Sequence, residues 1–91
     1  SHVYQRIDLE IEENEKESLN NKIKYWAPTN IGASIVKEKN DKDGFKYILE
    51  GGYWALIRFS GTEPLLRLHV EGKSENQVTE ILNEIKNYIF N

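Results

Sequence analysis

Residues 58–67 read RFSGTEPLLR and join two apolar runs, one over residues 53–57 and one over residues 65–70. Short apolar runs on either side of a polar segment that contains glycine and proline are typical of two β-strands and the connection between them. Because the connection is short, the two strands are expected to pair antiparallel. The stretch therefore predicts a hairpin that gathers hydroxyl groups and an arginine at its turn.

The polar connection of this hairpin carries groups that bind phosphate or another anion. Gly61 leaves the neighbouring backbone N–H groups free of a Cβ atom, and consecutive N–H groups can surround a phosphate. Ser60 and Thr62 add hydroxyl donors, and Arg58 offers a planar guanidinium that suits two phosphate oxygens. A plain turn remains the alternative, because Ser-Gly is ordinary turn chemistry and strand arginines often only pair with carboxylates.

Alternating apolar and charged residues predict further strands outside this hairpin. Residues 3–12 alternate with period two, which predicts a strand with one buried face and one solvated, mostly acidic face. Residues 31–39 have a weaker strand pattern, and residues 45–49 form another strand. The dipeptides Asp43-Gly44 and Gly51-Gly52 predict the turns between these strands.

Two segments have the apolar period of helices that pack on a sheet. In the first, Leu19, Ile23 and Trp26 share one stripe, and Pro28 ends the helix. The second follows Ser74, a favourable N-cap residue. Its stripe comprises Val78, Ile81, Leu82, Ile85 and Ile89. Together, the elements predict an α+β, two-layer domain: a four-stranded antiparallel sheet with two helices on one side, in the order β-α-β-β-β-α.

The composition is that of one ordinary globular domain. The chain has 91 residues, of which 38% are hydrophobic and 30% charged. Its net charge of −3 argues against a general nucleic-acid binder, and no apolar run approaches the about 18 residues that cross a membrane. The absence of cysteine is compatible with a cytoplasmic location. Because methionine is absent even at position 1, we expect a fragment of a longer protein, with Ser1-His2 left by an expression vector.

The segment RFSGTEP, residues 58–64, resembles the signature of the C-terminal domain of the phosphohexomutase family, which includes phosphoglucomutase, phosphomannomutase and phosphoglucosamine mutase. Other segments that look like that domain are Asp43-Gly44, Trp54, Arg67, Val70-Glu71-Gly72 and the final helix. The resemblance is strong from about residue 43 to residue 85. It implies that residues 3–91 are the single C-terminal phosphate-binding domain of a larger mutase, with a four-stranded sheet and helices on one side.

The resemblance also implies an activity for the parent enzyme, which is an isomerase that acts as an intramolecular phosphotransferase between hexose 1- and 6-phosphates. Family members use a phosphoserine, Mg²⁺ and a sugar-binding loop on other domains, and none of these motifs occurs in this chain. We therefore expect no catalytic residue, metal ligand or cofactor here, and Mg²⁺ only in the parent enzyme. The residues carried over as contacts to the substrate phosphate are Arg58, Ser60, Gly61, Thr62 and Arg67. The expected partners are a hexose phosphate and the other domains of the same chain, with no nucleic acid and no membrane.

Three alternatives stay open at this point. The sequence does not decide between glucose or mannose phosphates and glucosamine phosphates, because Phe59 resembles the first branch and residues 70–72 the second. Residues 43–50 faintly resemble the aromatic strand of an RNA-recognition motif, although the acidic charge argues against it. A purely structural domain with an idle loop is the third alternative.

The sequence also predicts the surroundings of two further side chains near the signature. Glu63 would repel a phosphate, so we expect it to turn away and to pair with an arginine such as Arg67. His69 falls on the same strand face as Arg67 by alternation. Because the sequence shows no partner for His69, we expect it to be a half-buried strand residue rather than a catalytic base.

Overall fold

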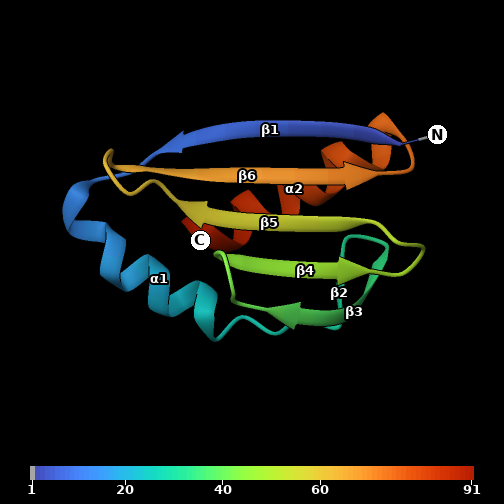
Figure 1. Ribbon diagram of the computed structural model, residues 1–91, viewed down its shortest axis with the longest axis horizontal. Helices are drawn as coiled ribbons and strands as arrows, with labels where there is room; N and C mark the ends of the chain where they lie inside the picture. The colour runs from blue at the N-terminus through green and yellow to red at the C-terminus, as the bar shows by residue number, and fades with distance from the viewer. Residues whose placement is uncertain (1) are drawn as a thin grey trace.

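The chain folds into one antiparallel sheet and two α-helices in a computed structural model that describes residues 2–91 (Figure 1). Of the expected vector-derived pair, Ser1 lies outside the described residues. The strands are β1 (Val3–Glu10), β2 (Asn30–Ile31), β3 (Ser34–Asn40), β4 (Phe45–Leu49), β5 (Trp54–Phe59) and β6 (Leu65–Gly72). The helices are α1 (Lys16–Lys24), which follows a short 3-10 helix η1 (Glu13–Glu15), and α2 (Glu75–Phe90).

The sheet has six strands in the order β1-β6-β5-β4-β3-β2, so the α+β class is confirmed but the expected four strands are too few. All neighbouring strands are antiparallel. The sequence patterns indicated five strand segments, one more than the four counted for the sheet, and β2 was missed because its two residues are too few to show an alternation. The weak pattern of residues 31–39 has its own cause, since Ile35 is half exposed and the register between β3 and β4 shifts between Val36 and Glu38.

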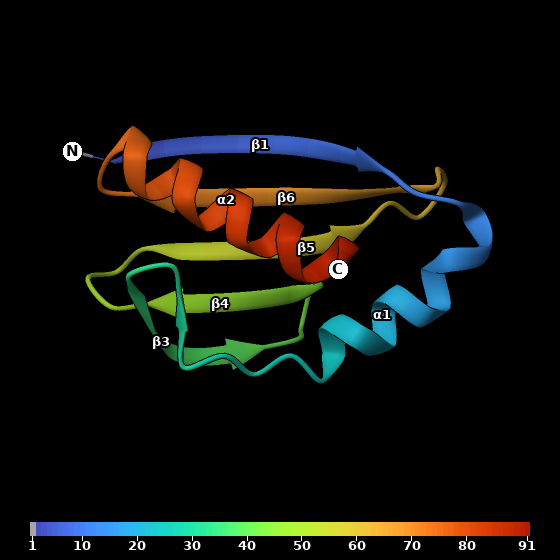
Figure 2. The ribbon, with the colours of Figure 1, turned by 180° about the vertical axis from the view of Figure 1, so that it is seen from behind.

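The expectation of two helices on one side of the sheet is wrong for α1: only α2 covers a face, whereas α1 runs along the sheet end where β1 and β5 finish (Figures 1 and 2). The predicted stripe of α2 is buried in full, and Leu19 and Ile23 of α1 reach the same core, as expected. The strand residues buried beneath α2 include Ala55, Ile57, Leu66, Leu68 and Val70. Neither described helix is long and apolar enough to cross a bilayer.

The C-terminal end of α1 is held by Lys39 of β3. The Lys39 ammonium donates to the carbonyl oxygens of Ile23, Lys24 and Trp26 at 2.8, 2.9 and 2.6 Å. Burial lowers the pKa of Lys39, although Asp41 acts in the opposite direction. This one side chain therefore satisfies carbonyls that a helix end leaves without partners.

The other face of the sheet is not covered by α2 and is turned toward the viewer in Figure 1. Strand β5 lies between β4 and β6, in the interior of the sheet. Its cover is one-sided, however, because Trp54 and Leu56 are only half-buried and Arg58 is exposed. We call this uncovered side of β1, β6, β5 and β4 the open face. It carries most of the polar groups described next.

Candidate functional site

The connection between β5 and β6 lies at one end of the sheet and is tied to it from two sides. The Ser60 N–H donates to the Leu65 carbonyl at 3.0 Å, which closes the loop on itself. The Ile11 N–H donates to the Pro64 carbonyl at 3.0 Å, which links the loop to the segment that follows β1. Residues 60–64 are therefore tied both to the start of β6 and to the distant segment that follows β1.

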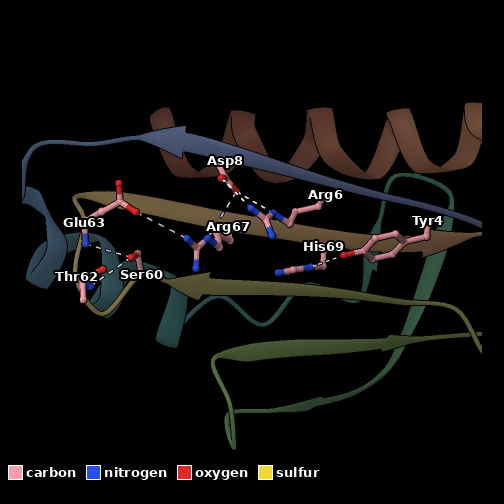
Figure 3. A network of polar contacts seen from close by, with 8 residues as sticks. All are labelled: Tyr4, Arg6, Asp8, Ser60, Thr62, Glu63, Arg67 and His69. Atoms are coloured by element: carbon pink, nitrogen blue, oxygen red, sulfur yellow. Dashed lines mark hydrogen bonds and ion pairs between the residues drawn. The ribbon is translucent and has the colours of Figure 1, made fainter.

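Ser60 organises the loop from inside. Its side chain is 6% exposed, and its hydroxyl oxygen accepts from the backbone N–H groups of Thr62 and Glu63 at 3.3 and 3.1 Å (Figure 3). These two N–H groups are turned toward Ser60, so they do not form the open nest that the sequence suggested. The hydroxyl proton of Ser60 remains free to donate to a ligand.

Neither the backbone conformation nor the packing at Gly61 requires glycine. Its φ is not among the positive values, and a Cβ atom built on it would meet nothing within 4 Å. Within residues 2–91, the Gly61 N–H and the Thr62 hydroxyl have no hydrogen-bond partner. The loop thus presents an N–H, a hydroxyl and an unfilled space at its exposed tip.

Two arginines face each other beside this loop. Arg58 of β5 is the direct cross-strand partner of Arg67 of β6, and like charges in this arrangement destabilise a sheet. Arg67 is 29% exposed and lies 3.8 Å from Asp8 and 4.0 Å from Glu63, as Figure 3 shows. The expected contact of Glu63 with Arg67 is therefore present at the limit of an ion pair. Across the part of the chain that the structure describes, Arg58 forms no ion pair.

Asp8 is the carboxylate that both neighbouring arginines share. It accepts from Arg6 at 3.3 Å (Nε) and 3.2 Å (Nη2), and it is the cross-strand partner of Arg67. The Nε of Arg67 is nevertheless buried without a hydrogen-bond partner. One carboxylate thus serves two guanidinium groups, and the region around Arg58 and Arg67 keeps an excess of positive charge.

His69 lies next to these arginines on the open face and is half-buried, as expected. The Tyr4 hydroxyl and His69 Nδ1 form a hydrogen bond of 2.7 Å (Figure 3). Burial lowers the pKa of His69, and Arg6, Arg58 and Arg67 lower it further. The imidazole is therefore neutral near pH 7, and Tyr4 donates to Nδ1 when the ring proton is on Nε2.

The residues of β1 are the part of the site that the sequence did not indicate. Alternation placed Arg6 and Asp8 on an outward face, which was interpreted as merely solvated. Their role depends on the pairing of β1 with β6, which aligns Asp8 with Arg67 and Arg6 with His69. No local pattern specifies this pairing, because more than 50 residues separate the two strands.

The described residues do not form a metal centre. Within residues 2–91, no group of three or more His, Cys, Asp or Glu side chains is placed to hold a metal ion. The groups that the site does offer are guanidinium, hydroxyl and N–H donors, which suit an anion.

Comparison with known proteins identifies the family. Residues 9–87 match the family described as phosphoglucomutase/phosphomannomutase, C-terminal domain. The chain belongs to this family. The match includes the loop, both central arginines of the open face and His69, whereas Tyr4, Arg6 and Asp8 precede it.

Individual members of the family cover the same region. A phosphoglucosamine mutase of Nautilia profundicola is 43% identical over 63 residues, which are 65% of this chain and 14% of the relative. The phosphoglucosamine mutase of Methanocaldococcus jannaschii is 36% identical over 85 residues, which are 92% of this chain and 18% of the relative. A phosphoglucomutase/phosphomannomutase of Thermococcus kodakarensis is 50% identical over 54 residues, which are 55% of this chain and 12% of the relative. The mutase C-terminal domain described here thus spans less than a fifth of these relatives.

Proposed function

We propose that this domain grips the phosphate of a hexose phosphate within a phosphoglucomutase/phosphomannomutase, an isomerase that moves a phosphoryl group between the 1- and 6-positions. The observation that carries the proposal is the cross-strand pair of Arg58 and Arg67. The guanidinium groups of Arg6, Arg58 and Arg67 outnumber the two carboxylates beside them, Asp8 and Glu63, which leaves a positive field beside the loop. A phosphate dianion placed between Arg58 and Arg67 would remove the like-charge repulsion.

Each candidate residue has a distinct role in this proposal. Arg58 binds two phosphate oxygens through its free guanidinium fork. The Gly61 N–H and the hydroxyls of Ser60 and Thr62 donate to the remaining oxygens. Arg67 supports the phosphate from the neighbouring strand, where Asp8 and Glu63 hold its guanidinium.

The phosphate bound here is the one that does not react. Binding energy from a remote phosphate orients the other end of the sugar for in-line phosphoryl transfer. Charge-assisted hydrogen bonds contribute about 1.5–3 kcal/mol each, so two or three of them change the rate of the parent enzyme by orders of magnitude. The chemistry itself, with the phosphoserine and Mg²⁺, is assigned to other domains of the parent chain, so the isolated domain is expected to be inactive.

The substrate of the parent enzyme is assigned by class. Glucose or mannose phosphate is the main assignment, and the alternative is a glucosamine phosphate, which the printed names of several relatives favour. A cytoplasmic location belongs to the same proposal and is supported by the absence of cysteine. Nucleic acid and membranes are not among the proposed partners.

The test is an NMR titration of the chain with inorganic phosphate and with glucose 1-phosphate. We expect saturable shifts at residues 58–62, and we expect Arg58→Ala to abolish them. Arg58→Lys keeps the charge but lacks the planar fork, so its affinity should lie between those of the wild type and Arg58→Ala. Lys73→Ala removes one positive charge beyond the opposite end of the sheet and should bind normally. Binding that survives Arg58→Ala, or no binding at millimolar ligand, would leave the loop as a structural turn.

A further inference from the structure

His69 lies in the middle of the open face, next to the proposed phosphate contacts but not among them. It stands on β6 two residues beyond Arg67, and its direct cross-strand partners are Arg6 on β1 and Leu56 on β5. Leu56 in turn precedes Arg58 by two residues on the same face of β5. The imidazole is therefore a neighbour of both central arginines, on the side of them that is away from the loop.

One hydrogen bond orients the imidazole. The Tyr4 hydroxyl lies 2.7 Å from His69 Nδ1, and Tyr4 pairs with Glu71, near the end of β6 opposite the loop. The other end of the ring, which carries Nε2, points toward Arg67, as Figure 3 shows. Within residues 2–91, the bond to Tyr4 is the one hydrogen bond of this ring, so Nε2 is left without a partner.

The imidazole is a neutral donor at this place. Burial lowers the pKa of His69, and three neighbouring arginines lower it further against the opposing effect of Asp8. The ring therefore carries a single proton near pH 7. Because the phenol of Tyr4 is the better donor of the two groups, it donates to Nδ1 and the ring proton is on Nε2. An N–H group is thus directed into the open space beside the arginines.

The surroundings of Nε2 suit a hydroxyl group of a sugar better than a phosphate oxygen. Leu56, the cross-strand partner of His69, is half-buried and offers an apolar surface beside the ring. A neutral N–H donor adds little to a phosphate that guanidinium groups already hold, because charge-assisted hydrogen bonds are about twice as strong. Small-molecule sites combine apolar contacts with a few oriented polar groups, and Leu56 and His69 provide one of each.

From this arrangement we propose that His69 is a further substrate-binding residue, whose Nε2–H donates to a hydroxyl oxygen of the sugar while the phosphate clamp holds its phosphate. The phosphate clamp comprises Arg58, Arg67 and residues 60–62, and the inference rests on the function proposed for it. Tyr4 is a positioning residue, because it acts on the ligand only through the ring of His69. The domain then selects a hexose phosphate over phosphate esters that lack hydroxyl groups.

The experiment compares glucose 1-phosphate, cyclohexyl phosphate and inorganic phosphate as NMR titrants of the same chain at pH 7.5. Cyclohexyl phosphate keeps a six-membered ring and the phosphate but has no hydroxyl group on the ring. We expect glucose 1-phosphate to bind about two- to tenfold more tightly than cyclohexyl phosphate, the range of one neutral hydrogen bond. The ¹⁵N resonances of the His69 ring should show the proton on Nε2, and glucose 1-phosphate should shift the Nε2 resonance most.

Four variants separate the sugar contact from the phosphate contacts. His69→Leu should abolish the preference for glucose 1-phosphate over cyclohexyl phosphate and leave the affinity for inorganic phosphate unchanged. His69→Gln places an amide N–H at a similar reach and should keep part of the preference. Tyr4→Phe should lose part of it, because the ring is no longer fixed. His2→Gln is the matched control, because it removes the other histidine of the chain, at the far end of the sheet, and should change nothing.

The outcomes distinguish the sugar contact from the clamp. If the wild-type chain binds glucose 1-phosphate no more tightly than cyclohexyl phosphate, or if the ring proton is on Nδ1, the role of His69 is refuted and the clamp stays intact. A His69→Leu variant that loses as much affinity for inorganic phosphate as for glucose 1-phosphate also refutes it, because the ring then does not distinguish the sugar. No binding of any of the three ligands refutes the clamp and the sugar contact together.

Discussion

Substitution of Gly61 by alanine should affect the stability of the domain and its affinity for phosphate in opposite directions. The backbone at Gly61 lacks a positive φ, and a Cβ atom there would meet no atom within 4 Å. Replacing glycine at such a position stabilises a protein by about 0.4–1 kcal/mol, because the unfolded chain loses conformational freedom. For a domain of this size, that gain raises Tm by about 2–8 °C.

The same methyl group should damage phosphate binding. It would stand in the unfilled space at the loop tip, where a phosphate must approach the Gly61 N–H. Losing a hydrogen bond to a charged group costs about 1.5–3 kcal/mol, which corresponds to a loss of about tenfold or more in affinity. The expected result is therefore a variant that is more stable and binds more weakly.

The assay combines thermal unfolding by circular dichroism with NMR titration of inorganic phosphate. Gly52→Ala is the matched control, because a Cβ atom on Gly52 also meets nothing within 4 Å but its φ is +86°. That variant should lose about 1–2 kcal/mol, the cost of a left-handed conformation for a residue with a Cβ atom, and should bind phosphate normally. A destabilised Gly61→Ala would refute the reasoning about the backbone. A stabilised Gly61→Ala with unchanged affinity would refute the placement of the phosphate.

Three further predictions concern stability. Burial and nearby arginines lower the pKa of His69 in the folded state, so the unfolded chain takes up a proton first as the pH falls, and the free energy of unfolding declines below pH 6.5. Urea unfolding at pH 7.5 and 5.5 should therefore show a smaller decline in His69→Gln than in the wild type. Equal declines would contradict the environment described for His69. Tyr4→Phe removes the 2.7 Å hydrogen bond to His69 and should cost about 0.5–1.5 kcal/mol in urea unfolding at pH 7.5, whereas no change would show that water replaces the hydroxyl. Lys39→Met leaves three carbonyls at the end of α1 without their donor and should cost about 1–3 kcal/mol, with faster amide hydrogen exchange in α1; unchanged exchange would contradict the capping role.

The elements that the sequence predicted well are those with a long local pattern. The stripe of α2 and the hairpin around residues 58–67 need only neighbouring residues, and both lie where expected. The two-residue strand β2 has no periodicity to recognise, so it was missing from the predicted sheet. The sequence also does not reveal that only one face of β5 is covered, because apolar Trp54 and Leu56 resemble buried residues.

In the candidate site, too, the features set by neighbouring residues could be predicted and those set by distant residues could not. Arg58, Arg67 and the loop residues are contiguous enough to be named from the sequence, and the hairpin does bring the two arginines opposite each other. The inward direction of the Ser60 side chain follows from the closing of the loop by the Ser60–Leu65 hydrogen bond, which composition does not specify. Asp8 and Tyr4 join the site only through a strand pairing between distant parts of the chain, and sequence patterns carry no information on such a pairing.

The pairing of β1 with β6 also determines when the site can form. Val3 pairs with Gly72 and Glu10 with Leu65, so more than half of the chain separates the partners. Contacts of such large sequence separation are slow to form, because the entropy of closing the intervening chain must be overcome first. On a ribosome, β1 would emerge long before its partner and would wait, unpaired along one edge, until β6 had been synthesised. The loop would receive its anchor at Ile11, and Arg67 its carboxylate, in the last step of folding, so a nascent or truncated chain without β6 would have no phosphate site.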